Sequence, residues 1–69
     1  MTEAEVNKER TFLREARQAK GLKQVNVARL AEITAGAYRN IEAGRRNPSV
    51  KCAKKIGEIV GVDWTLFYK

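Results

Sequence analysis

The chain has 69 residues, with one cysteine, no histidine and a net charge of +6. This length allows a single domain near the lower limit for a stable core, and one cysteine excludes an internal disulfide. Histidine is the commonest metal ligand and general base, so its absence leads us to expect no metal site, no cofactor and no enzyme.

The basic character of the chain favours a polyanionic partner, since the isoelectric point is near 9.9. Basic side chains cluster in one short region in which Glu42 is the single acidic residue: Arg39, Arg45, Arg46, Lys51, Lys54 and Lys55. Basic surfaces also serve solubility, so charge alone does not identify the partner. No apolar run reaches the roughly 18 to 20 residues that span a bilayer, and no signal peptide is visible. We therefore expect a cytoplasmic protein with no membrane partner.

The first two helices are predicted from the helical spacing of apolar residues. Residues 1–10 are polar and are expected to fray or to extend the first helix, so the domain proper spans 11–69. The first helix runs to about Ala19 and Gly21 closes it, and the second covers residues 24–31. Their inward faces carry the following apolar residues: Phe12, Leu13, Ala16, Val27, Ala28 and Ala31.

Three further helices follow, each preceded by a residue that can cap it. Thr34 is a typical N-cap for a third helix over residues 34–43. Ser49 caps a fourth helix that Gly61 ends, and Asp63 caps a short last helix. The apolar residues of these segments are Tyr38, Ile41, Val50, Ala53, Ile56, Val60, Trp64, Leu66 and Phe67. With no strand pattern in the sequence, the fold class is all-α.

Residues 22–49 place two short amphipathic helices and a basic loop in succession. This is the layout of a helix-turn-helix, whose second helix enters the DNA major groove. The outward face of that helix combines small Ala35 and Gly36 with Arg39 and Asn40. An asparagine can bond an adenine edge through two hydrogen bonds, and an arginine can reach a guanine or a phosphate. For any one of these residues alone, a solvated helix face is the alternative.

Gly36 is unusual because glycine inside a helix costs about 1 kcal/mol relative to alanine. Close approach between its backbone and a ligand would explain it, and so would a tolerated surface glycine.

Phosphate contacts are expected on both sides of this helix. Gln24 opens the second helix, where its amide and the helix dipole favour a phosphate, and Lys23 extends the same footprint. Arg45, Arg46 and Asn47 form a loop that can hold phosphates or reach the minor groove. A charged loop is usually just solvated, so this expectation depends on the position of the loop directly after the third helix.

A regularly spaced set of residues resembles the lambda-repressor-like, Cro/XRE-type helix-turn-helix domains: Leu13-Arg14, Arg17, Gly21-Leu22, Gln24, Val27-Ala28, Ile33-Thr34, Ile41-Glu42, Gly44 and Asn47-Pro48-Ser49. The resemblance extends from Leu13 to about Phe67. It implies a compact five-helix bundle in which helices 2 and 3 form the helix-turn-helix. It also implies double-stranded DNA as partner, often bound by a homodimer on a two-fold symmetric operator.

The resemblance assigns roles residue by residue. Gln24 matches a phosphate-binding glutamine, and Arg17 and Glu42 match a buried structural ion pair. Combined with the patterns above, it gives the candidate DNA-binding set: Lys23, Gln24, Thr34, Ala35, Gly36, Arg39, Asn40, Arg45, Arg46 and Asn47. The C-terminal aromatic residues either close the core or form a dimer surface, which we favour: Trp64, Phe67 and Tyr68.

Three positions depart from the family pattern. Lys23 replaces the usual serine or threonine cap, which predicts a less firmly started second helix. Glu32 replaces the usual turn glycine, and a positive φ there would cost about 1 to 2 kcal/mol. Ala35 and Gly36 offer little hydrogen bonding, so specificity is expected from Arg39, Asn40 and DNA shape.

The sequence therefore predicts a sequence-specific, repressor-like transcriptional regulator from a bacterium or its phage. One alternative keeps the fold but makes the protein an antitoxin or accessory factor that acts through a protein partner. A second alternative is a non-specific basic binder of nucleic acid or anionic membrane. Cys52 is interpreted as a small, partly buried hydrophobic residue rather than a redox sensor.

Overall fold

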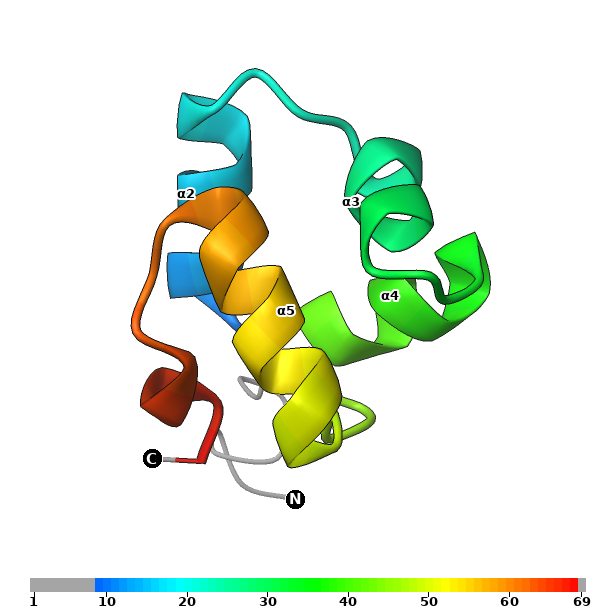
Figure 1. The fold of residues 1–69 in the computed structure, drawn as a ribbon, viewed down its shortest axis with the longest axis vertical. Helices are drawn as coiled ribbons and strands as arrows, with labels where there is room; N and C mark the ends of the chain where they lie inside the picture. The colour runs from blue at the N-terminus through cyan, green and yellow to red at the C-terminus, as the bar shows by residue number, and fades with distance from the viewer. Residues whose placement is uncertain (1–8, 69) are drawn as a thin grey trace.

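A computed structural model describes residues 9–68 of the chain. It contains α2 (Thr11–Ala19), α3 (Gln24–Leu30), α4 (Ala35–Glu42) and α5 (Val50–Val60), followed by the 3₁₀ helix η1 (Trp64–Tyr68). Figure 1 shows α3 and α4 together on one side of the molecule, α2 and η1 on the other, and α5 between them. No residue from 9 to 68 lies in a strand, so the all-α class is confirmed for this part of the chain. Of the polar segment 1–10, residues 1–8 lie outside the described residues.

Side-chain caps begin two of the helices where the sequence predicted them. The Thr34 hydroxyl accepts a hydrogen bond of 3.0 Å from the Ala37 N–H at the start of α4. The Ser49 hydroxyl accepts one of 3.1 Å from the Cys52 N–H at the start of α5. Each bond satisfies a backbone donor that has no partner within its helix, which fixes both helix starts.

The helix α3 begins without a cap from the preceding side chain, because lysine has no acceptor. Instead, Asn26 Oδ1 accepts a hydrogen bond of 2.9 Å from the Lys23 N–H. This bond is one half of a capping box, made from inside the helix. The departure at Lys23 is therefore partly compensated three residues further along the chain.

The turn between α3 and α4 contains a strained residue. Glu32 has φ of +64° and is the only non-glycine residue with positive φ among residues 9–68. Its carboxylate lies 3.3 Å from Lys55 Nζ in an exposed ion pair. A side chain in this left-handed conformation costs about 1 to 2 kcal/mol, as the sequence comparison with a turn glycine anticipated.

The predicted count of five helices is wrong for the described residues, which form four α-helices and one 3₁₀ helix. The last segment is a 3₁₀ helix with a bond of 3.1 Å from the Leu66 N–H to the carbonyl of Asp63, three residues earlier. A segment of five residues is less than two turns of 3₁₀ helix, and such short pieces often adopt this geometry. Asp63 does cap it, because its Oδ1 accepts a hydrogen bond of 3.0 Å from the Thr65 N–H.

The core draws on every helix, and its buried apolar residues are Leu13, Val27, Ala28, Ala31, Tyr38, Ile41, Ala53, Ile56, Val60 and Phe67. Phe12 and Ala16 pack against it while only partly buried. Val50, predicted to join the inward stripe of α5, is 50% exposed because it is the first residue of that helix. No helix formed by residues 9–68 is long and apolar enough to cross a membrane.

Candidate nucleic-acid interface

A buried ion pair joins α2 to α4 below the outward face of α4. Arg17 Nε donates to Glu42 Oε2 at 2.8 Å, and Arg17 Nη2 donates to Glu42 Oε1 at 3.1 Å. Both residues are buried, as the sequence interpretation required. The third guanidinium nitrogen, Nη1, donates to the carbonyl of Leu22 at 2.9 Å, so the same arginine also holds the connection between α2 and α3.

The Glu42 carboxylate accepts two further hydrogen bonds. The Tyr38 hydroxyl donates to Oε2 and the Gln24 amide donates to Oε1, both at 2.9 Å. Burial alone would raise the pKa of Glu42, but the bonds from Arg17, Gln24 and Tyr38 together hold it below its ordinary value. Burial also raises the pKa of Tyr38, so its phenol stays protonated and can donate.

The sequence predicts that the Gln24 amide binds a phosphate, but in the structure this amide donates a hydrogen bond to Glu42. One N–H of its amide is used by Glu42, and the side chain is only partly exposed. An amide has a second N–H, which remains available for a phosphate. Gln24 also lines a cavity of about 360 Å³ with Arg14, Arg17 and Arg39.

The outward face of α4 is formed by residues at helical spacing. Gly36 and Arg39 are exposed, Asn40 is partly exposed, and the capping residue Thr34 is exposed at the start of the helix. Beyond the backbone of its own helix and its chain neighbours, a Cβ atom at Gly36 would meet no atom of residues 9–68 within 4 Å, so packing within this part of the chain does not require glycine there. Ala35 is partly buried against the core, which leaves its methyl group less accessible than the sequence suggested.

The basic loop, residues 44–48, follows α4 directly. Gly44 has φ of +81° and turns the chain away from the helix. Arg45, Arg46 and Asn47 are exposed, and Arg45 Nη1 donates to Asn40 Oδ1 at 3.4 Å. The loop therefore stands beside the last turn of α4, with one arginine orienting the amide of Asn40.

Arg10 was missed by the sequence analysis, which placed it at the end of the polar segment. Its Nη1 donates to the carbonyls of Ile41 at 2.6 Å and Arg46 at 3.1 Å. Its Nη2 donates to Asn47 Oδ1 at 2.6 Å and to the carbonyl of Phe67 at 3.3 Å. No local pattern reveals these contacts, because the partners lie 31 to 57 residues further along the chain.

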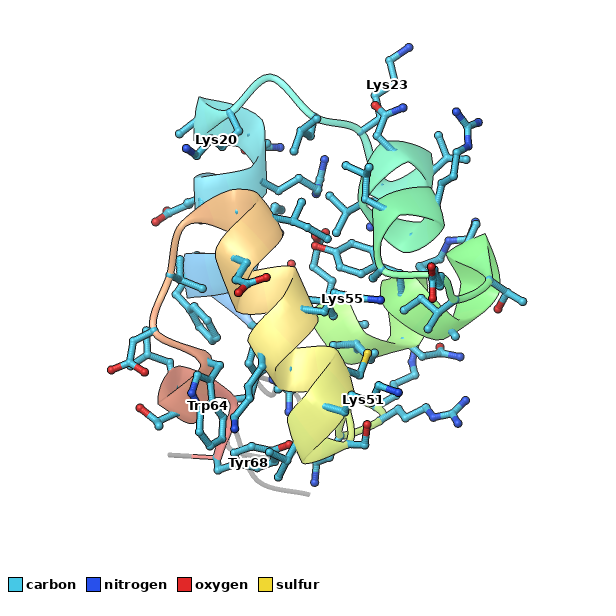
Figure 2. The ribbon with its side chains drawn as sticks, in the orientation of Figure 1. Lys20, Lys23, Lys51, Lys55, Trp64 and Tyr68 are labelled. Atoms are coloured by element: carbon cyan, nitrogen blue, oxygen red, sulfur yellow. The ribbon has the colours of Figure 1, made fainter. Side chains whose placement is uncertain are left out.

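The remaining basic residues are distributed over more than one surface. Lys23 stands at the start of α3, and Lys51 and Lys55 lie on α5 (Figure 2). Lys54 lies over the Trp64 ring at 5.2 Å from its centre, and Lys55 pairs with Glu32. The basic residues between 39 and 55 therefore do not form one cluster. The arginines lie on α4 and the basic loop, whereas the lysines lie on α5.

The C-terminal aromatic residues do not share one environment. Phe67 is buried and packs edge-on against Phe12 at 5.5 Å between ring centres, so it is a core residue and not part of an exposed surface. Trp64 is partly buried and Tyr68 is 46% exposed, with a spacing of 6.1 Å between their ring centres. A dimer surface at this end could use only Trp64 and Tyr68.

Comparison with known proteins assigns the class of this fold. The helix-turn-helix family matches residues 13–67, and the chain belongs to this family. The resemblance to Cro/XRE-type domains is thereby confirmed. The chain is similar to a protein of Bacillus subtilis (strain 168) named as the uncharacterized HTH-type transcriptional regulator YqaF. The two are 47% identical over 60 residues, which cover 87% of this chain and 79% of the relative.

Proposed function

We propose that this protein is a transcriptional regulator that binds double-stranded DNA in a sequence-specific manner, with α4 in the major groove. The observation that carries the proposal is the combined surface of α4 and the basic loop. An open glycine, an exposed arginine and an oriented asparagine lie on one helix face, and two exposed arginines follow at its end. The name of the Bacillus subtilis relative supports the regulatory role.

The two parts of this surface have different tasks in the proposal. Asn40 and Arg39 read base edges, because amide and guanidinium groups match the hydrogen-bonding pattern of adenine and guanine. Arg45 and Arg46 bind phosphates, which fixes the register of α4 on the duplex without reading sequence. Gln24 adds a phosphate contact through its second amide N–H, while the buried Glu42 holds the side chain in place.

The protein is proposed to act in the cytoplasm as a homodimer on a two-fold symmetric site. Tyr68, which is 46% exposed, and the partly buried Trp64 supply the aromatic surface for that contact, and a protein partner is a further candidate regulator. Neither a catalytic role nor a cofactor enters the proposal.

The phosphate-binding part is tested by titrating a pool of random-sequence duplexes with the full chain at several salt concentrations. Replacing both Arg45 and Arg46 by alanine should weaken binding and reduce the slope of log affinity against log salt by about two. Lys20→Ala is the control for loss of a basic side chain outside the interface, since Lys20 lies on the α2 side of the molecule (Figure 2); it removes one positive charge, so its effect is compared per charge. An unchanged slope in the double variant, or a similar loss in Lys20→Ala, would contradict the proposed interface.

A further inference from the structure

We propose that Arg10 and Tyr68 are positioning residues for DNA binding, which hold the inner side of the basic loop so that its outward side chains meet the phosphates. The proposal rests on the function proposed above. It assigns a task to two residues near opposite ends of the chain that share no sequence motif.

The inner side of the loop is held at three successive residues. Arg10 binds the Arg46 carbonyl and Asn47 Oδ1, and the Tyr68 hydroxyl donates to the Pro48 carbonyl at 2.6 Å. Loops are usually mobile, and ordering one on binding costs conformational entropy. A loop already held at three positions pays less of that cost when it meets DNA.

Arg10 is itself fixed from several directions. Its backbone N–H donates to the Glu42 carbonyl at 2.8 Å, and its guanidinium lies 5.5 Å from the centre of the Phe67 ring. The Ile41 carbonyl that it binds belongs to the last turn of α4, where a cation is favoured by the helix dipole. The loop is therefore attached to both α4 and η1 through one side chain with a planar, forked guanidinium.

The bond to Asn47 also determines which part of its amide faces outward. Arginine can only donate, so the oxygen of the amide must face Arg10. The amide nitrogen, with its two donors, is then directed away from that contact. Donors are what a phosphate requires, and Asn47 is exposed. The four acceptors of Arg10 are uncharged, so its positive charge is retained beside the loop.

The test compares Arg10→Lys, Arg10→Gln and Tyr68→Phe with the unmodified chain. Lysine keeps the charge but loses the fork, and phenylalanine keeps the ring but loses the hydroxyl. Thr65→Ala is the control for Tyr68→Phe, because its hydroxyl bonds Asp63 within the same C-terminal region and makes no bond to the loop. Backbone ¹⁵N relaxation of residues 45–47 measures loop mobility without DNA, and the duplex-pool titration measures affinity.

We expect greater loop mobility in all three variants but not in Thr65→Ala. Affinity should fall about 3- to 10-fold in Tyr68→Phe, and by similar factors in Arg10→Lys and Arg10→Gln. Full affinity in Arg10→Lys would show that only charge matters and would overturn the proposal. It is also overturned if the loop stays rigid, or if it becomes mobile with no loss of affinity. If the unmodified chain binds no duplex, the proposed function fails first, and the relaxation data show separately whether the loop is held.

Discussion

Arg17 and Glu42 connect α2 to α4 through two hydrogen bonds in the interior of a small domain. The same carboxylate also accepts hydrogen bonds from Tyr38 and Gln24. Glu42, at the end of α4, therefore anchors the helix that is proposed to read DNA. It also holds Gln24 of α3, which is proposed to bind a phosphate. Stability and recognition are linked at this residue.

Removing one partner of this pair should be costly, because the other charge is left buried. We expect Arg17→Met to lower the free energy of unfolding by about 3 to 5 kcal/mol, measured by urea denaturation. Arg14→Met is the matched control, since Arg14 pairs with Glu9 at the surface and should lose less than about 1 kcal/mol. Equal losses of unfolding free energy in the two variants would show that the buried ion pair contributes no more to stability than the surface pair.

Acid should destabilise the protein through Glu42, whose pKa in the folded chain lies below 4.5. A carboxyl group whose pKa is lower in the folded than in the unfolded chain contributes fully to stability above its pKa in the unfolded chain. This contribution is lost as the pH falls through its pKa in the folded chain. We expect the free energy of unfolding to decrease below about pH 4.5, and to decrease less steeply in Glu42→Gln. Urea denaturation across this range measures both slopes, and parallel curves would contradict the assignment.

Gly36→Ala separates the two interpretations of this glycine. A methyl group there meets no atom of residues 9–68 within 4 Å apart from its own helix backbone and chain neighbours, so the free protein should gain about 0.5 to 1 kcal/mol from better helix propensity. If the backbone approaches DNA closely, the same variant should bind the duplex pool more weakly or select a different sequence. A gain in stability with unchanged affinity and specificity would identify a tolerated surface glycine.

Glu32→Gly should raise the melting temperature by a few degrees. Glycine removes about 1 to 2 kcal/mol of strain at φ of +64°, and this exceeds its entropic cost of about 0.4 to 1 kcal/mol in the unfolded chain. The Glu32→Gln variant keeps the strained backbone and removes only the exposed ion pair with Lys55. A melting temperature that falls as far in Glu32→Gly as in Glu32→Gln would mean that the strain is small.

Local signals account for the parts of the fold that the sequence predicted. Thr34 and Ser49 each stand directly before an amphipathic segment, and each accepts a hydrogen bond from the residue three positions later. The Arg17–Glu42 pair and the positive φ of Glu32 were anticipated from the resemblance to a known family, which supplied contacts that no local pattern contains.

The remaining features depend on contacts between distant residues. The hydrogen bonds from Arg10 to α4, the basic loop and η1 could not be predicted from the polar N-terminal sequence around this residue. Gly57 is required because a Cβ there would lie 2.8 Å from the Val62 carbonyl, a contact set by the path of the chain after α5. The aromatic residues of the last segment were expected either to close the core or to form a dimer surface, and the 3₁₀ helix divides them, because Phe67 is buried in the core while Tyr68 is exposed.

In-vitro selection from a random duplex library, with the full chain at about 0.15 M salt, tests the central claim most directly. A sequence-reading α4 predicts enrichment of one motif, arranged as an inverted repeat if the protein binds as a homodimer. Asn40→Ala should then lose the preference at one position of each half-site, while Lys20→Ala should select the same motif as the unmodified chain. Recovery of DNA with no shared motif would contradict the claim that this protein reads sequence.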